Sequence, residues 1–315
     1  MTAIDEEVVF GVKKYALATS SGVRSTNEDR FRIITNLELF GKGLLMTERA
    51  SIQNYDDALL QRTMESYVNN KGSAPVYDVN TLLKTKTASD TELYGIYDGH
   101  GGARCSSLLA LLLPLYLLRH PDFAYSIENA AKQACLAIND EILKREAANQ
   151  CEGGSTAITL LIRKDIAYFC NTGDCRAIIV SRQGVIALTT DHKATNEVER
   201  RRVEEAGGMV LYVRGVPRVN GRLAVARAFG DSELKECVIP LPDVTIHELT
   251  PEDEFIVLAS DGLWDALPNE QVLSCIHNNP WLSTQEMAKV LIDRAIELGS
   301  MDNITVLIVD VRRQP

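Results

Sequence analysis

Cysteine is too scattered in this chain to build a disulfide framework. Seven cysteines are spread over 315 residues, and no two of them form a C-x-x-C pair. An odd, scattered set favours reduced thiols, and therefore a cytoplasmic or nuclear protein, over a small secreted domain. A bridge between Cys170 and Cys175, which flank an expected hairpin, is the one pairing that the spacing leaves open.

The sequence also lacks an apolar run long enough to cross a bilayer. The most apolar segment, 108–118, has about half of the roughly 20 residues that a spanning helix needs, and it contains Pro114. We expect a buried helix there, kinked at the proline. Residues 1–10 are acidic rather than basic, and Thr2 stands where myristoylation requires glycine. We therefore expect no signal peptide, no myristoyl group and no membrane span.

Positive charge is in short supply, which argues against nucleic acid as a partner. The formal net charge is −10 at pH 7, whereas binding to a nucleic-acid backbone needs a basic face. The composition is otherwise that of a globular protein, with 45% hydrophobic and 24% charged residues. A length of 315 residues allows a large core. We find neither an internal repeat nor a low-complexity tract.

The most informative stretch that the sequence does contain is LYGIYDGHGG at 93–102. A short apolar segment of strand character ends in Asp98. Gly99 lets the backbone come close to a ligand and leaves its own carbonyl free. His100 then stands beside the same spot. This arrangement suits a hard metal ion together with a proton donor, although DGHG by itself also occurs in plain turns.

Further acidic residues stand next to apolar stretches elsewhere in the chain. They are Glu28, Asp29, Asp261 and Asp302. Carboxylates gathered at strand ends repel one another unless a counterion lies between them. If these ends converge in space, they require bound cations.

The order of expected elements favours an α+β fold. Short strands cluster as turn-linked hairpins and helices come in pairs, which is typical of helices packed outside antiparallel sheets. Ser126 can cap a helix whose apolar positions repeat at helical spacing. Segment 36–90 reads as an insertion and 210–226 as irregular. Strands are expected at 8–20, 31–35, 156–162, 166–170, 176–180, 185–188, 244–249, 255–259 and 304–311, and further helices from about 103 and at 197–206, 271–277 and 284–298.

Taken in order, the motifs around these residues resemble those of the metal-dependent protein serine/threonine phosphatases of type 2C. The resemblance covers about 15–309 and keeps every acidic member of the family pattern. It departs from that pattern at Ala194, Cys175 and Phe229, none of which is a ligand position. The matching motifs are RSTNED at 24–29, DGHGG at 98–102, GSTA at 154–157, GDCR at 173–176, DHK at 191–193, EAGG at 205–208, VNGRLAVARAFGD at 219–231, SDGLWD at 260–265 and SMDN at 300–303.

The resemblance implies a four-layer α-β-β-α sandwich of two antiparallel sheets flanked by helices. It implies one phosphatase catalytic domain over 1–315, with the insertion at 36–90 and a mobile flap beside the cleft at 197–220. It also implies a centre for two Mg²⁺ or Mn²⁺ ions and a weaker third. The implied ligands are Asp98 bridging two ions, the Gly99 carbonyl on one, Asp261 and Asp302 on the other, Glu28 and Asp29 largely through water, and Asp174 and Asp265 for the third ion.

The chemistry implied by the resemblance is hydrolysis of phosphoserine and phosphothreonine in proteins. A water bridging the two ions attacks phosphorus directly, so no phosphoenzyme is needed. His100 would protonate the leaving oxygen, and Arg24 would grip the phosphate with its planar fork. The all-oxygen ligand set suits Mg²⁺ or Mn²⁺ rather than Zn²⁺.

Other interpretations of the same residues stay open at this point. The chain could be a catalytically dead relative that serves as a scaffold, or a metal-dependent phosphodiesterase or nuclease. Gly173 and Asp174 also make a good hairpin turn without any metal. The insertion at 36–90 could be a partner-docking arm, a lid or a neutral surface elaboration. We expect a monomer.

Overall fold

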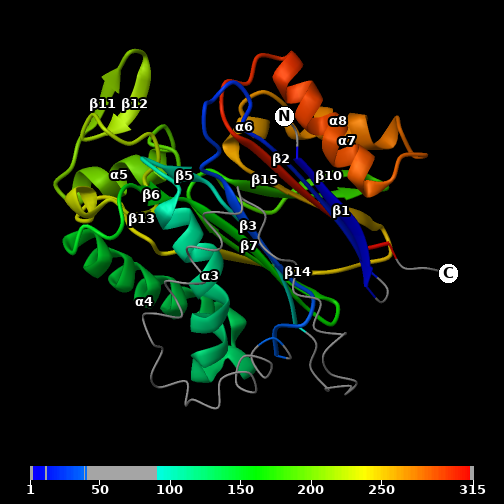
Figure 1. Cartoon of the computed structure of the whole chain (residues 1–315), viewed down its shortest axis with the longest axis horizontal. Helices are drawn as coiled ribbons and strands as arrows, with labels where there is room; N and C mark the ends of the chain where they lie inside the picture. Colours follow the sequence, from blue (N-terminus) through cyan, green and yellow to red (C-terminus); the bar gives the residue numbers. More distant parts are fainter. Residues whose placement is uncertain (1–2, 11–12, 39, 41–90, 313–315) are drawn as a thin grey trace.

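Two antiparallel sheets with helices outside them form the framework of the molecule (Figure 1). The computed structural model describes residues 3–10, 13–38, 40 and 91–312. In Figure 1, α3 and α4 lie on one outer side of the two sheets, and α7 and α8 lie on the other. The four layers match the expected α-β-β-α sandwich. Most of the insertion expected at 36–90 lies outside the described residues.

The first sheet has six strands in the order β1-β2-β16-β15-β9-β10. Helices α7 (Asn269–His277) and α8 (Thr284–Glu297) cover its outer face, where α8 contacts β2 and β16. The strands are β1 (Ala3–Phe10), β2 (Lys13–Ser20), β16 (Ile304–Asp310), β15 (Asp253–Ala259), β9 (Arg176–Ser181) and β10 (Gly184–Ala187).

The second sheet has five strands in the order β14-β8-β7-β4-β3. Helices α3 (Arg104–Arg119) and α4 (Ile127–Ala147) cover it. The strands are β14 (Asp243–Glu248), β8 (Ile166–Thr172), β7 (Ala157–Arg163), β4 (Thr91–Tyr97) and β3 (Arg30–Ile34).

Alternation along β15 shows how the sequence builds the two cores. Ile256 and Leu258 belong to the core between the sheets. Their neighbours Phe255, Val257 and Ala259 belong to the core under α7 and α8. Successive side chains of a strand point to opposite faces. Residues 255–259 therefore face a core on each side of the sheet. Because both faces are buried, this part of β15 is apolar at every position and does not alternate.

The two long helices form for local reasons that the sequence displays. The Ser126 hydroxyl accepts a hydrogen bond from the Asn129 amide at 3.2 Å and so caps α4. Helix α3 contains Pro114, and most of its residues are buried. The expected buried helix with an internal proline is therefore present. No helix among the described residues is long and apolar enough to span a membrane.

A smaller group of elements adjoins the sandwich and includes the flap expected at 197–220. A three-stranded sheet runs in the order β13-β6-β5. A satellite apolar cluster joins Val203 and Val219, which lie within 197–220, to apolar residues between 225 and 238. The elements are β5 (Gly99–His100), β6 (Gly154–Ser155), β13 (Phe229–Gly230), α5 (Glu197–Glu205), β11 (Val210–Val213) and β12 (Val216–Val219).

Three expectations about elements were wrong in detail. The strand expected at 8–20 is the antiparallel pair β1 and β2. The segment 210–226, expected to be irregular, begins with the hairpin of β11 and β12. The chain around Gly173 is not a hairpin turn, because β8 and β9 belong to different sheets. Strand β8 pairs instead with β7 and β14, so the chain crosses between the sheets there. Cys170 and Cys175 are free thiols.

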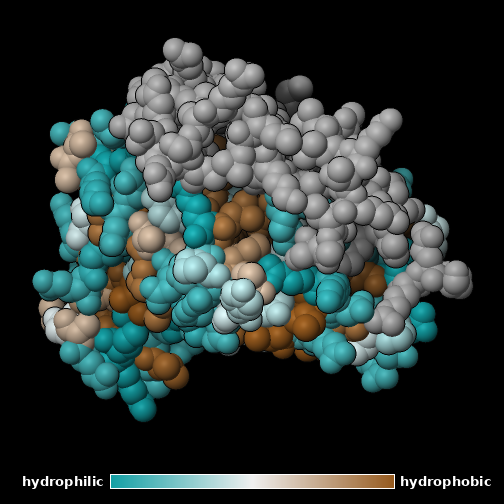
Figure 2. Space-filling model, turned by 90° about the horizontal axis from the view of Figure 1, so that it is seen from below, coloured by the Kyte–Doolittle hydropathy of each residue, from teal (hydrophilic) through white to brown (hydrophobic). Residues whose placement is uncertain are grey.

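In the part of the lower face that Figure 2 colours, hydrophilic residues alternate with apolar areas. Apolar residues show between the hydrophilic ones in separate areas of that face. Single exposed apolar residues are ordinary on globular proteins.

Candidate metal centre and active site

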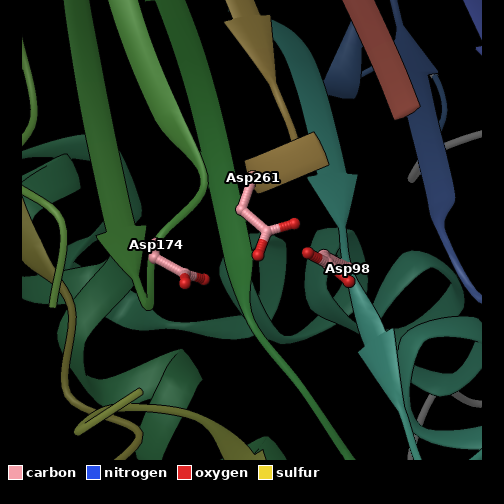
Figure 3. A group of neighbouring side chains, drawn as sticks. All are labelled: Asp98, Asp174 and Asp261. Carbon is pink, nitrogen blue, oxygen red and sulfur yellow. The ribbon is translucent and has the colours of Figure 1, made fainter. Parts of the chain in front are cut away.

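Three carboxylates converge at the edge where both sheets end (Figure 3). Asp98 follows β4, Asp174 lies where the chain crosses between the sheets, and Asp261 begins the short helix α6 (Asp261–Trp264) after β15. One carboxylate oxygen from each lies within 4.8 Å of the others. Figure 3 shows the three side chains pointing into a shared space. Of the acidic ends that the sequence pattern singled out, Asp98 and Asp261 meet in this group, together with Asp174, which only the family resemblance had indicated.

The environment of these carboxylates disfavours their charged forms. Burial raises the pKa of Asp98 well above its usual value, and the negative charges of Asp261 and Asp29 raise it further. Burial, followed by the charge of Asp174, likewise raises the pKa of Asp261. For Asp174 itself, burial raises the pKa to about 6. Like charges held together out of water create a strong demand for a cation.

Asp29 lies beside this cluster and is almost completely buried. Its Oδ2 accepts hydrogen bonds from Ser260 Oγ at 2.8 Å and Thr305 Oγ1 at 2.7 Å. Its Oδ1 is buried without a hydrogen-bond partner. Burial raises the pKa of Asp29 to about 6. An unsatisfied buried carboxylate oxygen beside an all-oxygen cluster fits a hard divalent cation such as Mg²⁺ or Mn²⁺.

Gly99 and Glu28 lie against each other on the neighbouring loops. A Cβ on Gly99 would stand only 2.7 Å from the Glu28 carbonyl oxygen and 2.8 Å from Ser106 Oγ, so no side chain fits there. The Glu28 carboxylate accepts the Gly102 amide at 3.2 Å, and the Glu28 amide donates to Asn303 Oδ1 at 2.8 Å. Glycine is therefore needed at 99 to let these two loops approach.

Asp302 and Arg24 form an ion pair beside the cluster. Arg24 Nη2 donates to Asp302 Oδ2 at 2.9 Å, with 56% of the Arg24 side chain and 40% of the Asp302 side chain exposed. Asp302 is not one of the three residues grouped within 4.8 Å. Its negative charge nevertheless contributes to the raised pKa values of Asp98 and Asp261. Asp302 therefore lies near the cluster, and the positive charge of Arg24 partly balances its negative charge.

Asp265 has a basic partner that the sequence reasoning did not single out. Lys193 Nζ donates to Asp265 Oδ1. The positive charge of Lys193 also acts on Asp174 and Asp261, in both cases lowering the pKa against the stronger effect of burial. The only sequence signal for Lys193 is its place at the end of the DHK motif.

His100 also has a partner that the sequence reasoning missed. His100 Nε2 lies 2.8 Å from Asp231 Oδ2. Asp231 is the last residue of the motif VNGRLAVARAFGD, and no role follows from that position alone. Because a carboxylate only accepts hydrogen bonds, Nε2 is the nitrogen that donates when Asp231 is ionised.

Comparison with known proteins agrees with this arrangement of acidic residues. The family described as Protein phosphatase 2C matches residues 68–304 of the chain. That range includes most of the motifs and the residues of the carboxylate cluster. The chain belongs to the protein phosphatase 2C family, whose members depend on Mg²⁺ or Mn²⁺.

Curated plant proteins are similar to this chain over the same region. Probable protein phosphatase 2C 59 of Oryza sativa subsp. japonica is 39% identical over 217 residues, which is 69% of this chain and 65% of the relative. Probable protein phosphatase 2C 69 of Arabidopsis thaliana is also 39% identical over 217 residues, with 69% of this chain and 60% of the relative covered. The chain thus covers less than two thirds of the length of either relative.

Solved structures share the fold. The crystal structure of serine-threonine phosphatase 2C from Toxoplasma gondii superposes with a TM-score of 0.73 at 22% identity, covering 98% of this chain and 99% of that one. A C. elegans sex determining protein gives a TM-score of 0.73 at 23% identity, covering 96% of this chain and 66% of that one. These two likenesses support the sandwich architecture.

Proposed function

We propose that this chain is a Mg²⁺- or Mn²⁺-dependent phosphatase that hydrolyses phosphoserine and phosphothreonine in proteins. The observation that carries the proposal is the convergence of Asp98, Asp174 and Asp261 within 4.8 Å, in a member of the protein phosphatase 2C family. A dead scaffold would have no need to keep these mutually repelling groups. Their unfavourable burial is explained if they bind cations.

The surrounding residues supply oxygen ligands for two divalent cations and a weaker third. When bound, Mg²⁺ or Mn²⁺ supplies Lewis acidity, which makes water a nucleophile at neutral pH and offsets the charge of the phosphate. The free Oδ1 of Asp29 and the glycine at 99 support this assignment. The proposed ligands are Asp98 for both main ions, the Gly99 carbonyl for one, Asp261 and Asp302 for the other, Glu28 and Asp29 through water, and Asp174 and Asp265 for the third.

Arg24 binds the substrate phosphate in this proposal. Its guanidinium is exposed and already holds a carboxylate of the centre, Asp302, at 2.9 Å. A phosphate offers the same paired oxygens, which a planar guanidinium binds with two parallel hydrogen bonds. Arg24 then exchanges one anionic partner for another when substrate arrives.

His100 donates the proton that the leaving oxygen of serine or threonine needs. An alkoxide leaves poorly, so protonation during P–O cleavage lowers the barrier. Because water attacks phosphorus directly, the chain needs no serine or cysteine nucleophile. The thiol of Cys175, for example, lies buried with its pKa raised well above the usual value by burial.

Two other segments have proposed roles in choosing partners. The flap at 197–220 takes part in selecting protein substrates. The insertion at 36–90 serves regulation or partner binding; its residues 39 and 41–90 lie outside the described ranges. The whole chain acts as one catalytic domain.

The decisive experiment measures phosphate release from a phosphothreonine peptide with Mn²⁺, with Mg²⁺ and with excess chelator. Activity should appear with either cation and disappear with chelator, and Asp98→Ala should be inactive under all three conditions. Activity that survives the chelator would contradict the mechanism. An inactive wild-type protein that still binds Mn²⁺ would indicate a scaffold. Cleavage of a phosphodiester instead of the peptide would indicate the nuclease class.

A further inference from the structure

Asp231 stands where it can control the orientation of the His100 ring. The two side chains meet at 2.8 Å between Nε2 and Oδ2, and 29% of the His100 side chain and 13% of the Asp231 side chain are exposed. Asp231 follows β13 and is 131 residues away from His100 along the chain. The contact therefore depends on the tertiary fold and not on local sequence.

Asp231 is held in place by an unusual backbone and by α4. Its φ is 54°, in the left-handed region that non-glycine residues rarely adopt. The Glu146 carboxylate accepts the amides of both Asp231, at 3.0 Å, and Ser232, at 3.1 Å. About two turns earlier on the same face of α4, Asn139 Oδ1 accepts the Gly230 amide at 3.2 Å. A strained turn supported by two side chains of one helix indicates a position that the fold enforces.

Gly154 in β6 packs directly against the His100–Asp231 pair. Gly154 pairs with His100 on one side and with Gly230 on the other. A Cβ at Gly154 would lie 2.2 Å from Asp231 Oδ2 and 2.5 Å from His100 Nε2. The carboxylate and the ring are thus packed against backbone and have little room for other orientations.

We propose that Asp231 is a positioning residue for His100 in phosphoester hydrolysis, held in turn by Glu146. Asp231 accepts the hydrogen on Nε2 and so directs Nδ1 to the leaving oxygen. As the P–O bond to serine or threonine breaks, the Nδ1 proton moves to that oxygen, while oxygen from water bonds to phosphorus. The products are the free hydroxyl, dihydrogen phosphate, which keeps both protons of the attacking water, and a neutral imidazole that keeps its Nε2 hydrogen. This inference rests on the proposed function.

The test is Asp231→Asn, because asparagine keeps the size of the side chain and tolerates a left-handed backbone. With a phosphothreonine peptide, kcat should fall by about tenfold or more while KM changes little, since the general acid is misdirected. With an aryl phosphate, whose leaving group needs no proton, kcat should fall far less. Glu146→Gln should give the same pattern more weakly. Glu254→Gln, which removes a similar pair with His277 at 3.1 Å, is the matched control and should change neither rate.

A double variant and a spectroscopic readout separate positioning from a structural role. In the His100→Ala background, Asp231→Asn should add no further loss on the peptide. ¹⁵N NMR of the His100 imidazole, assigned by comparison with His100→Ala, should show hydrogen on Nε2 in the wild type. That pattern should change in Asp231→Asn, while Mn²⁺ affinity by calorimetry and the melting temperature stay the same.

Defined outcomes overturn the proposal. Equal losses on both substrates, additive losses in the double variant, or an unchanged imidazole spectrum would each contradict it. If Asp231→Asn does not fold, the same measurements on Glu146→Gln decide the matter. A wild-type protein without phosphatase activity would contradict the proposed function, whereas the NMR comparison tests the pairing of His100 without any turnover.

Discussion

Two basic residues each hold a carboxylate that the proposed metal centre would use. Arg24 pairs with Asp302 and Lys193 with Asp265. A fixed positive charge beside a ligand competes with any cation that approaches the same oxygens. In the proposed centre, the chain would both supply these ligands and limit how tightly they bind ions.

Replacing Lys193 with methionine should tighten the weakest cation site. The change removes a positive charge from Asp265 and from the neighbourhood of Asp174 and Asp261. Mn²⁺ should then bind more tightly at the weak site, by about tenfold for the loss of one nearby unit charge. Titration calorimetry measures this directly. Lys289→Met, on the exposed side of α8, is the matched control and should leave the affinity unchanged. Unchanged or weaker binding in Lys193→Met would contradict the competition.

Substituting alanine for Gly99 should weaken metal binding while leaving the fold intact. The added Cβ would stand 2.7 Å from the Glu28 carbonyl oxygen, so the two loops must move apart. That movement shifts the Gly99 carbonyl relative to Asp98 and should lower Mn²⁺ affinity by about tenfold. Calorimetry with Mn²⁺, together with a melting curve in chelator, separates the two effects. An unchanged affinity would show that the Gly99 carbonyl does not bind a cation.

Single residues differ in how much of their role the sequence could predict. Asp98 follows a strand-like run directly and Asp261 follows one after Ser260, so local pattern already indicated that they lie near strand ends. Lys193 and Asp231 were missed because their partners are 72 and 131 residues away. Tertiary packing decides which lysine or histidine side chain pairs with which carboxylate, and no local sequence pattern encodes these pairs.

At the scale of elements, the turn at Gly173 shows where local reasoning fails. Glycine followed by aspartate gives the same signal for a hairpin and for a crossing between sheets. The outcome depends on strand pairing: β9 takes β10 and β15 as neighbours, while β8 takes β7 and β14. This crossing is also what carries Asp174 to the carboxylate cluster. The expected helices were predicted well because capping and apolar spacing are local, as at Ser126.

The hairpin of β11 and β12 carries apolar side chains that nothing in the described residues covers fully. Tyr212 is 73% exposed, and Leu211, Val213 and Val216 are 44%, 38% and 43% exposed. Exposed apolar residues grouped on one element are typical of an interaction site. The hairpin lies within 197–220, the segment proposed to select substrates, so we propose that its partner is the protein substrate.

Tyr212→Ser should therefore weaken the use of protein substrates without affecting the chemistry. KM for a phosphoprotein should rise by about three- to tenfold, because a large exposed aromatic contact is lost. The rate with a small aryl phosphate should stay the same. Tyr125→Ser alters another exposed tyrosine, 90% exposed after the 3-10 helix Pro121–Ala124, and is the matched control. A parallel change on both substrates would contradict a role in substrate choice.

For the whole molecule, the sandwich itself creates an electrostatic repulsion that the proposed cations would relieve. Asp98 extends from the five-stranded sheet and Asp261 from the six-stranded sheet, so packing the sheets face to face brings like charges together. The chain as a whole adds to this repulsion with a net charge of −10. A fold that gathers like charges in this way gives up stability when no cation lies between them.

The stability of the metal-free protein should therefore fall as pH rises through the acidic range. The pKa values of Asp29 and Asp174 are raised from 3.8 to about 6 in the folded state, so the folded protein binds more protons than the unfolded one between these values. Their contribution is favourable near pH 4 and is lost above about pH 6. Chemical unfolding in chelator measures the free energy of unfolding at each pH. For Asp174→Asn this free energy should fall less steeply with rising pH, whereas Asp140→Asn, an exposed matched control, should follow the wild type. Saturating Mn²⁺ should raise the melting temperature more at about pH 7 than at about pH 5, because protons compete with the ion. A metal-induced rise that is equal at both pH values would contradict the role of these carboxylates as ligands.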